Sequence, residues 1–97
     1  MKGVTIMTDI RFCEMAERKC KLSNCTLLEF NSIHCLMLVH SPVIDGLFIY
    51  QYDDNKPDES DFAWHILRGV PNTNEGFQYI MDLYQMFITR PQDHKKR

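Results

Sequence analysis

The chain has 97 residues, of which 44% are hydrophobic and 25% are charged. This length suits a single domain and leaves no room for a second independent core, and this composition excludes a chain that is disordered throughout. The formal net charge of −2 excludes the strongly basic field that concentrates nucleic acid around a protein. We therefore expect one α+β domain over residues 1–91, followed by a basic polar tail over residues 92–97.

The sequence predicts a cytoplasmic protein. The first nine residues reach a charge at Asp9 before an apolar signal core could form, and the longest apolar run, 35–39, is too short to span a bilayer. Without a secretory signal, reduced thiols are expected at all four cysteines, which contain no C-x-x-C pair: Cys13, Cys20, Cys25 and Cys35.

The N-terminal segment predicts a short strand at 4–7 and a helix from about 9 to 20. The helix is favoured because residues 14–19 are good helix formers and because one side carries an apolar stripe, namely Ile10, Cys13, Ala16 and Cys20. The alternative is a longer strand, because apolar residues alternate with polar ones from Val4 to Phe12.

The middle of the chain predicts an antiparallel meander. Three segments have the length and the β-branched or aromatic content of strands: 26–30, 33–40 and 47–52. The second of them ends before Pro42, because proline has no amide hydrogen to donate. Asp45 and Gly46 predict a tight turn before the third.

Two helices are predicted after the meander. Pro57 and the acidic residues after it favour a helix opening, and this helix would end at Gly69 after an apolar stripe of Phe62, Ala63, Ile66 and Leu67. Thr73 or Asn74 would cap the last helix, which carries the most regular stripe in the chain: Phe77, Ile80, Met81, Tyr84, Phe87 and Ile88. The expected fold is α+β: a small antiparallel sheet of about three to four strands, packed by two C-terminal helices and a short N-terminal helix.

The predicted sheet has two apolar faces. Both sides of the segments 33–40 and 47–52 are apolar near the middle, whereas a strand with one wet face alternates between apolar and polar residues. A large apolar surface is rarely left in water, so the second face must be covered. The sequence leaves three covers open: the N-terminal helix, a second copy of the protein, or a ligand cavity between sheet and helices.

No metal or cofactor is expected. The intervals between Cys20, Cys25, His34 and His40 fit no standard zinc site, and the histidines would lie at opposite ends of one strand face. The acidic segment 53–61 lacks the glycine and the final carboxylate of an EF-hand loop.

No catalytic residue is assigned. Ser41 and His40 are neighbours in a strand, so their side chains point to opposite faces. Asp61 and His65 have the i, i+4 spacing of a helix pair, which is far more often a surface ion pair than an acid and base in catalysis.

Aromatic side chains are the best candidates for a ligand or partner surface: Phe48, Tyr50, Tyr52, Trp64 and Tyr84. Such side chains and methionine are enriched where proteins meet. The sequence therefore predicts a non-catalytic protein–protein interaction or regulatory domain that self-associates as a homodimer, without membrane or nucleic-acid partners. A short domain of this kind would suit an accessory gene of a phage or mobile element. The alternative is a small-molecule-binding or enzymatic domain in which the same aromatic residues line a pocket.

Overall fold

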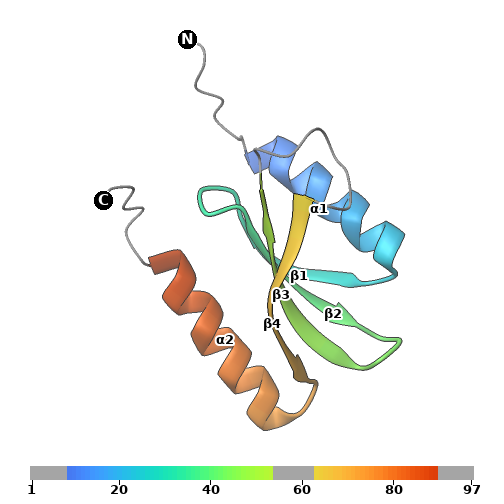
Figure 1. Cartoon of the computed structure of the whole chain (residues 1–97), viewed down its shortest axis with the longest axis vertical. Helices are drawn as coiled ribbons and strands as arrows, with labels where there is room; N and C mark the ends of the chain where they lie inside the picture. The colour runs from blue at the N-terminus through green and yellow to red at the C-terminus, as the bar shows by residue number, and fades with distance from the viewer. Residues whose placement is uncertain (1–8, 54–62, 90–97) are drawn as a thin grey trace.

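The computed structural model describes residues 9–53 and 63–89 of the chain. In these residues the order of elements is α1 (Asp9–Ser23), β1 (Thr26–Asn31), β2 (Leu36–Ser41), β3 (Gly46–Tyr52), β4 (Trp64–Pro71) and α2 (Asn74–Thr89). The strands form one antiparallel sheet in the order β1-β2-β3-β4, with α1 on one face and α2 on the other (Figure 1). The strand predicted at 4–7 and the tail at 92–97 lie outside the described residues.

Helix α1 confirms the helix predicted from residue 9, and the alternative of a strand through Phe12 is wrong. The side chains that α1 buries are Phe12, Met15, Ala16 and Cys20. The predicted stripe was therefore displaced by part of a turn, since Ile10 is 74% exposed. The helix ends where Asn24 adopts a φ of 59° and the amide of Cys25 donates to the carbonyl of Cys20 at 2.8 Å, a common way to satisfy the last carbonyls of a helix.

The meander of β1, β2 and β3 confirms the three predicted strands. The second strand begins at Leu36 instead of residue 33, because residues 32–35 form the turn from β1. In that turn Cys35 has a φ of 58°, and the amide of His34 donates to the side chain of Asn31 at 2.9 Å. His34 therefore lies in a turn, and the prediction that it shares a strand face with His40 is wrong.

The predicted helix ending at Gly69 is wrong, because its second half is strand β4. This strand pairs antiparallel with β3, so that Trp64 lies opposite Tyr52 and Gly69 lies opposite Phe48. Pairing and packing decide between helix and strand here, since Ile66, Leu67 and Val70 suit a strand as well as a helix. The residues of the expected helix before position 63 lie outside the described residues.

Helix α2 confirms the last predicted helix. Thr73 precedes it as the cap, with the amide of Gly76 donating to its Oγ1 at 3.0 Å. Ile80 and Tyr84 are buried as predicted, whereas Phe77 is 47% exposed and does not belong to the buried stripe. Within residues 9–53 and 63–89, no helix has both the length and the apolar character needed to cross a lipid bilayer.

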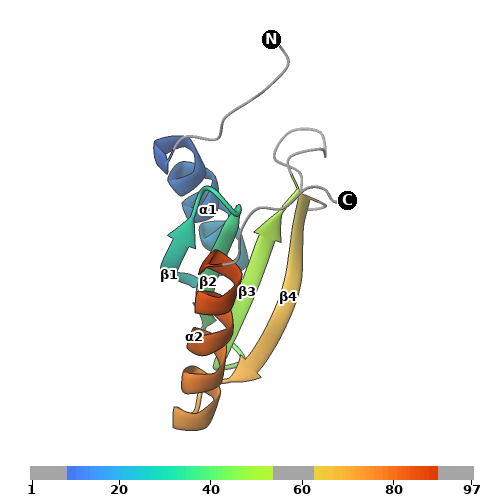
Figure 2. The same ribbon diagram turned by 90° about the vertical axis from the view of Figure 1, so that its left-hand side faces the viewer.

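Each face of the sheet carries its own core. The core under α1 joins its buried residues to the sheet residues Met37, Val39, Tyr52 and Trp64. The core under α2 joins Ile80 and Tyr84 to the sheet residues Leu36, Leu38, Leu47 and Ile49. In place of the two expected C-terminal helices, the described residues contain the strand β4 and one helix, α2, which packs opposite α1. Helix α2 packs on side chains of β2 and β3 and lies closest to β3 and β4, on the face of the sheet opposite α1 (Figure 2).

Candidate interaction surface

The structure brings four of the five predicted aromatic residues together. Phe48, Tyr50 and Tyr52 alternate along β3, so they lie on one face of the sheet, and Trp64 joins them from the neighbouring strand. This is the face that α1 covers. Tyr84 belongs to the core under α2, on the opposite face, so the five residues do not line one pocket.

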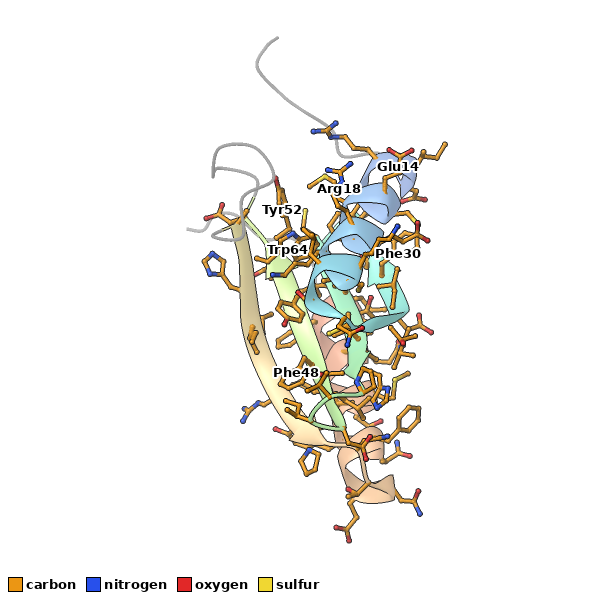
Figure 3. All side chains as sticks on the ribbon, turned by 90° about the vertical axis from the view of Figure 1, so that its right-hand side faces the viewer. Glu14, Arg18, Phe30, Phe48, Tyr52 and Trp64 are labelled. Atoms are coloured by element: carbon orange, nitrogen blue, oxygen red, sulfur yellow. The ribbon has the colours of Figure 1, made fainter. Side chains whose placement is uncertain are left out.

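Trp64 and Tyr52 are core residues. Their ring centroids lie 5.1 Å apart, and the ring of Phe12 in α1 lies 5.8 Å from that of Trp64. Trp64 is 8% exposed and Tyr52 is 7% exposed. Both rings therefore hold α1 to the sheet, as Figure 3 shows, and little of either is free to meet a partner.

The other aromatic residues on this face, Phe48 and Tyr50, pack against the core under α1 but remain only half-buried. Their ring centroids are 6.5 Å apart, and the amine of Lys19 lies 5.8 Å from the ring of Tyr50. Burial raises the pKa of the Tyr50 hydroxyl, with a smaller contribution from the thiols of Cys25 and Cys20. Ile66 faces the same way from β4, opposite Tyr50, and is 56% exposed. We call Phe48, Tyr50 and Ile66 the aromatic patch.

The opposite face of β4, on the side of α2, is partly exposed. Leu67 is 39% exposed, and the exposed guanidinium of Arg68 lies 5.8 Å from the ring of Tyr79 in α2. A shallow recess of about 230 Å³ lies beside this part of β4, and its walls are His34, Leu36, Gln51, Leu67 and Phe87. It mixes polar and apolar side chains and contains none of the five predicted aromatic residues.

The middle of β4 is exposed although both helices reach this strand, since Trp64 packs in the core under α1 and α2 lies close to β3 and β4. In Figure 3, α1 stands in front of β1 and β2, while β4 runs along the far margin of the sheet. The burial pattern agrees, because every residue from Ile66 to Gly69 is exposed. Strand β4 is therefore a sheet edge that exposes an apolar side chain on each face, Ile66 on one and Leu67 on the other.

A second recess, of about 330 Å³, lies between α1 and β1. Its lining is mainly apolar and comes from Asp9, Ile10, Cys13, Glu14 and Phe30. The hydroxyl of Ser32 donates to the carboxylate of Asp9 close to it, which ties the start of α1 to the turn after β1. This bond has a structural role, because it fixes the helix on the sheet.

His40, Asp45 and Asn72 form a polar cluster at the other end of the sheet. The Oδ1 atom of Asp45 lies 2.9 Å from Nε2 of His40 and accepts from Nδ2 of Asn72 at 3.0 Å. These bonds, the one to His40 first, lower the pKa of Asp45. Asp45 lies in the β2–β3 turn, where it has a φ of 52°, and Asn72 follows β4. The cluster therefore joins this turn to the end of β4. Ser41 is buried beside Gly46 and takes no part in it.

The described cysteine and histidine side chains are dispersed over the fold. In the described residues, no three His, Cys, Asp or Glu side chains lie close enough together to hold an ion. All four cysteines are free thiols, and burial raises the pKa of Cys20 to about 11, which keeps that thiol protonated and unreactive. The expectation that Asp61 and His65 form an i, i+4 pair on a helix is wrong, because His65 lies in the strand β4.

Sequence reasoning missed Ile66 and Gly69 as surface residues of an edge strand, because it assigned their segment to a helix. Pro71 was the available signal: a proline that ends an apolar, β-branched run is typical of an edge strand. A comparison with family models, with curated proteins and with solved structures finds no match for this chain. The geometry of the surface is therefore the only guide to the function of this chain.

Proposed function

We propose that this chain is a non-catalytic protein–protein interaction domain that works as a homodimer. The observation that carries the proposal is the exposure of β4 on both faces, with Ile66 56% and Leu67 39% exposed. Beside it, the half-buried rings of Phe48 and Tyr50 continue the apolar surface onto β3. Apolar surface of this kind is stabilised when it is removed from water, at about 25 cal/mol for each Å².

A second copy is the simplest partner for such a surface. Closed two-fold dimers are the commonest oligomers, and both subunits then contribute the same patch. A domain of 97 residues also buries a smaller share of its surface than a large one, so it gains more stability from association. Aromatic side chains such as those of the patch are enriched at the contacts of homodimers.

The alternative of a small-molecule site has less support. Its five candidate residues are divided between the two faces of the sheet, with Tyr84 on the side away from the other four. Of those four, Tyr52 and Trp64 are occupied in holding α1. A ligand that raised the melting temperature of the monomer would favour this alternative.

Light scattering at micromolar concentrations tests the proposal. We expect about twice the chain mass of 11.5 kDa. Tyr50→Glu places a charge in the aromatic patch and should shift the protein towards the monomer while its circular dichroism is retained. Leu28→Glu is the matched control, because Leu28 is 41% exposed on β1, and it should leave the mass unchanged. A monomer at every concentration would contradict the proposal.

A further inference from the structure

The outer edge of β4 has a definite pattern of backbone groups that point away from β3. The amide of Tyr52 donates to the carbonyl of Cys35 at 2.8 Å, so the backbone groups of Tyr52 point away from β4. Tyr52 and Trp64 are therefore a non-hydrogen-bonded pair of the antiparallel ladder. In such a pair the partner residue also points away, which directs the amide and carbonyl of Trp64 outward.

The same alternation fixes the other outward positions. Along β3, Tyr50, Phe48 and Gly46 have the orientation of Tyr52, and their partners in β4 are Ile66, Gly69 and Pro71. The register shifts between Ile49 and Tyr50, where β4 contains one additional residue, Leu67. The interval between the outward positions 66 and 69 is therefore three residues instead of two. Pro71 fits this assignment, because its missing amide hydrogen would have faced outward.

We propose that β4 pairs antiparallel with β4 of a second copy, about a two-fold axis between Leu67 and Arg68. This inference rests on the homodimer proposed above and specifies its contact. Ile66 then lies opposite Gly69 of the second copy, and Trp64 lies opposite Pro71. Two four-stranded sheets become one continuous sheet, and the outward amides of Trp64, Ile66 and Gly69 find carbonyl acceptors.

The inserted residue favours a second copy over an unrelated extended peptide. A regular strand presents outward groups at every second residue, so it matches only one half of β4 at a time. In a second copy paired about the proposed axis, the three-residue interval lies directly opposite that of the first. The outward positions 64, 66, 69 and 71 are symmetric about this axis. The other edge strand, β1, is shorter, with six residues against eight in β4, and it lies beside α1.

The side chains fit the same register. Gly69 has no side chain, and its place is taken by the ring of Phe48, which lies so close that a Cβ atom at position 69 would be 2.5 Å from Cε1. Ile66 of the second copy would lie beside this ring, which gives the exposed isoleucine an apolar contact on the face of the aromatic patch. On the opposite face, Leu67 would lie next to the aliphatic part of Arg68, whose guanidinium stays over Tyr79.

Amide hydrogen exchange of the full chain, followed by NMR at low and high protein concentration, tests the register. We expect the amides of Trp64, Ile66 and Gly69 to become protected as the dimer forms, while the inward amides of Arg68 and Val70 are protected at both concentrations. A dimer in which the three outward amides still exchange freely would overturn the β4 pairing and leave the homodimer standing. Protection of these amides in a protein with the monomer mass would show a cover from within the chain and would overturn both proposals.

A proline substitution separates the backbone from the side chain. Ile66→Pro removes an amide hydrogen that points away from β3, so the sheet of one chain stays intact while one bond to the second copy is lost at each end. Ile66→Ala removes the side chain and keeps this amide. We expect Ile66→Pro to raise the dimer dissociation constant by at least about tenfold more than Ile66→Ala does. Equal dissociation constants would contradict the pairing, and the exchange experiment decides the matter if the proline variant does not fold.

Discussion

The ring of Phe48 occupies the space that a side chain at Gly69 would need. A Cβ atom built at position 69 comes within 2.5 Å of Cε1 and 2.6 Å of Cδ1 of this ring, and one built at position 46 comes within 3.1 Å of its Cε2. An aromatic ring laid over a glycine restores the cross-strand contact that glycine itself lacks. Phe48 therefore joins β3 to the edge strand and leaves room for no other residue at position 69.

Gly69→Ala should lower the free energy of unfolding by about 1–3 kcal/mol, as is usual when a methyl group is forced into an occupied space. Urea denaturation measures this change. The control is the same substitution in a Phe48→Ala background, where the space is empty and the added methyl group should cost less. Equal costs in both backgrounds would mean that the ring is not the reason for the glycine.

The phase of α2 is tested by truncating one buried and one exposed residue. Ile80 is 0% exposed, so Ile80→Ala should cost about 2–5 kcal/mol of unfolding free energy. Gln85 is exposed on the same helix, and Gln85→Ala should cost less than about 0.5 kcal/mol. Thermal or urea unfolding of the two variants provides the comparison, and equal effects would contradict the packing of α2.

Local signals were sufficient for most of the fold. The tight turn at Asp45 and Gly46, the cap at Thr73 and the helical periodicity of residues 80–88 are properties of short segments, and the structure contains all three. Strand β4 depended on its neighbours instead. Its residues 63–67 carry a helix-like stripe, and only the pairing of Trp64 with Tyr52 across the sheet favours the extended form.

The candidate surface was predictable only where local alternation along one strand determines which side chains share a face. Alternation along β3 placed Phe48, Tyr50 and Tyr52 on one face from sequence alone. The two faces of the sheet explain why Tyr84 does not join them, since α1 and α2 pack on opposite sides. Which side each helix would cover was not encoded in any local pattern, and neither was the exposure of Ile66 and Leu67 at the edge of the sheet.

Asp45 should make stability depend on acid pH. Its bonds to His40 and Asn72 lower its pKa below the ordinary value of 3.8, so the unfolded chain binds the proton more readily. This contribution is fully present above pH 3.8 and is lost as the pH falls through the lower pKa of the folded state. Asp45→Asn tolerates the positive φ but carries no charge. Between about pH 4 and pH 2, unfolding free energies of the two proteins should converge. A constant difference would exclude Asp45 as the cause.

The hydroxyl of Tyr84 is buried without a hydrogen-bond partner among the described residues. The side chain is 1% exposed in the core under α2, and burial raises the pKa of the hydroxyl, with Glu29 adding to the effect. An unpaired polar group in such a place costs about 1–3 kcal/mol relative to its hydration in the unfolded chain. The ring itself stabilises the core, whereas the oxygen atom opposes folding.

Tyr84→Phe should therefore leave the free energy of unfolding unchanged or raise it by about 1 kcal/mol, because it removes the oxygen and keeps the ring. Tyr84→Ala should lower it by about 3–5 kcal/mol, since the ring is lost as well. Tyr79→Phe serves as the matched control: Tyr79 is 47% exposed, its hydroxyl remains accessible to water, and its replacement should change little. Urea denaturation of the three variants gives the comparison. If Tyr84→Phe alone lowered stability by more than about 1 kcal/mol, the hydroxyl would have a partner in solution, and a buried water molecule would be the first to consider.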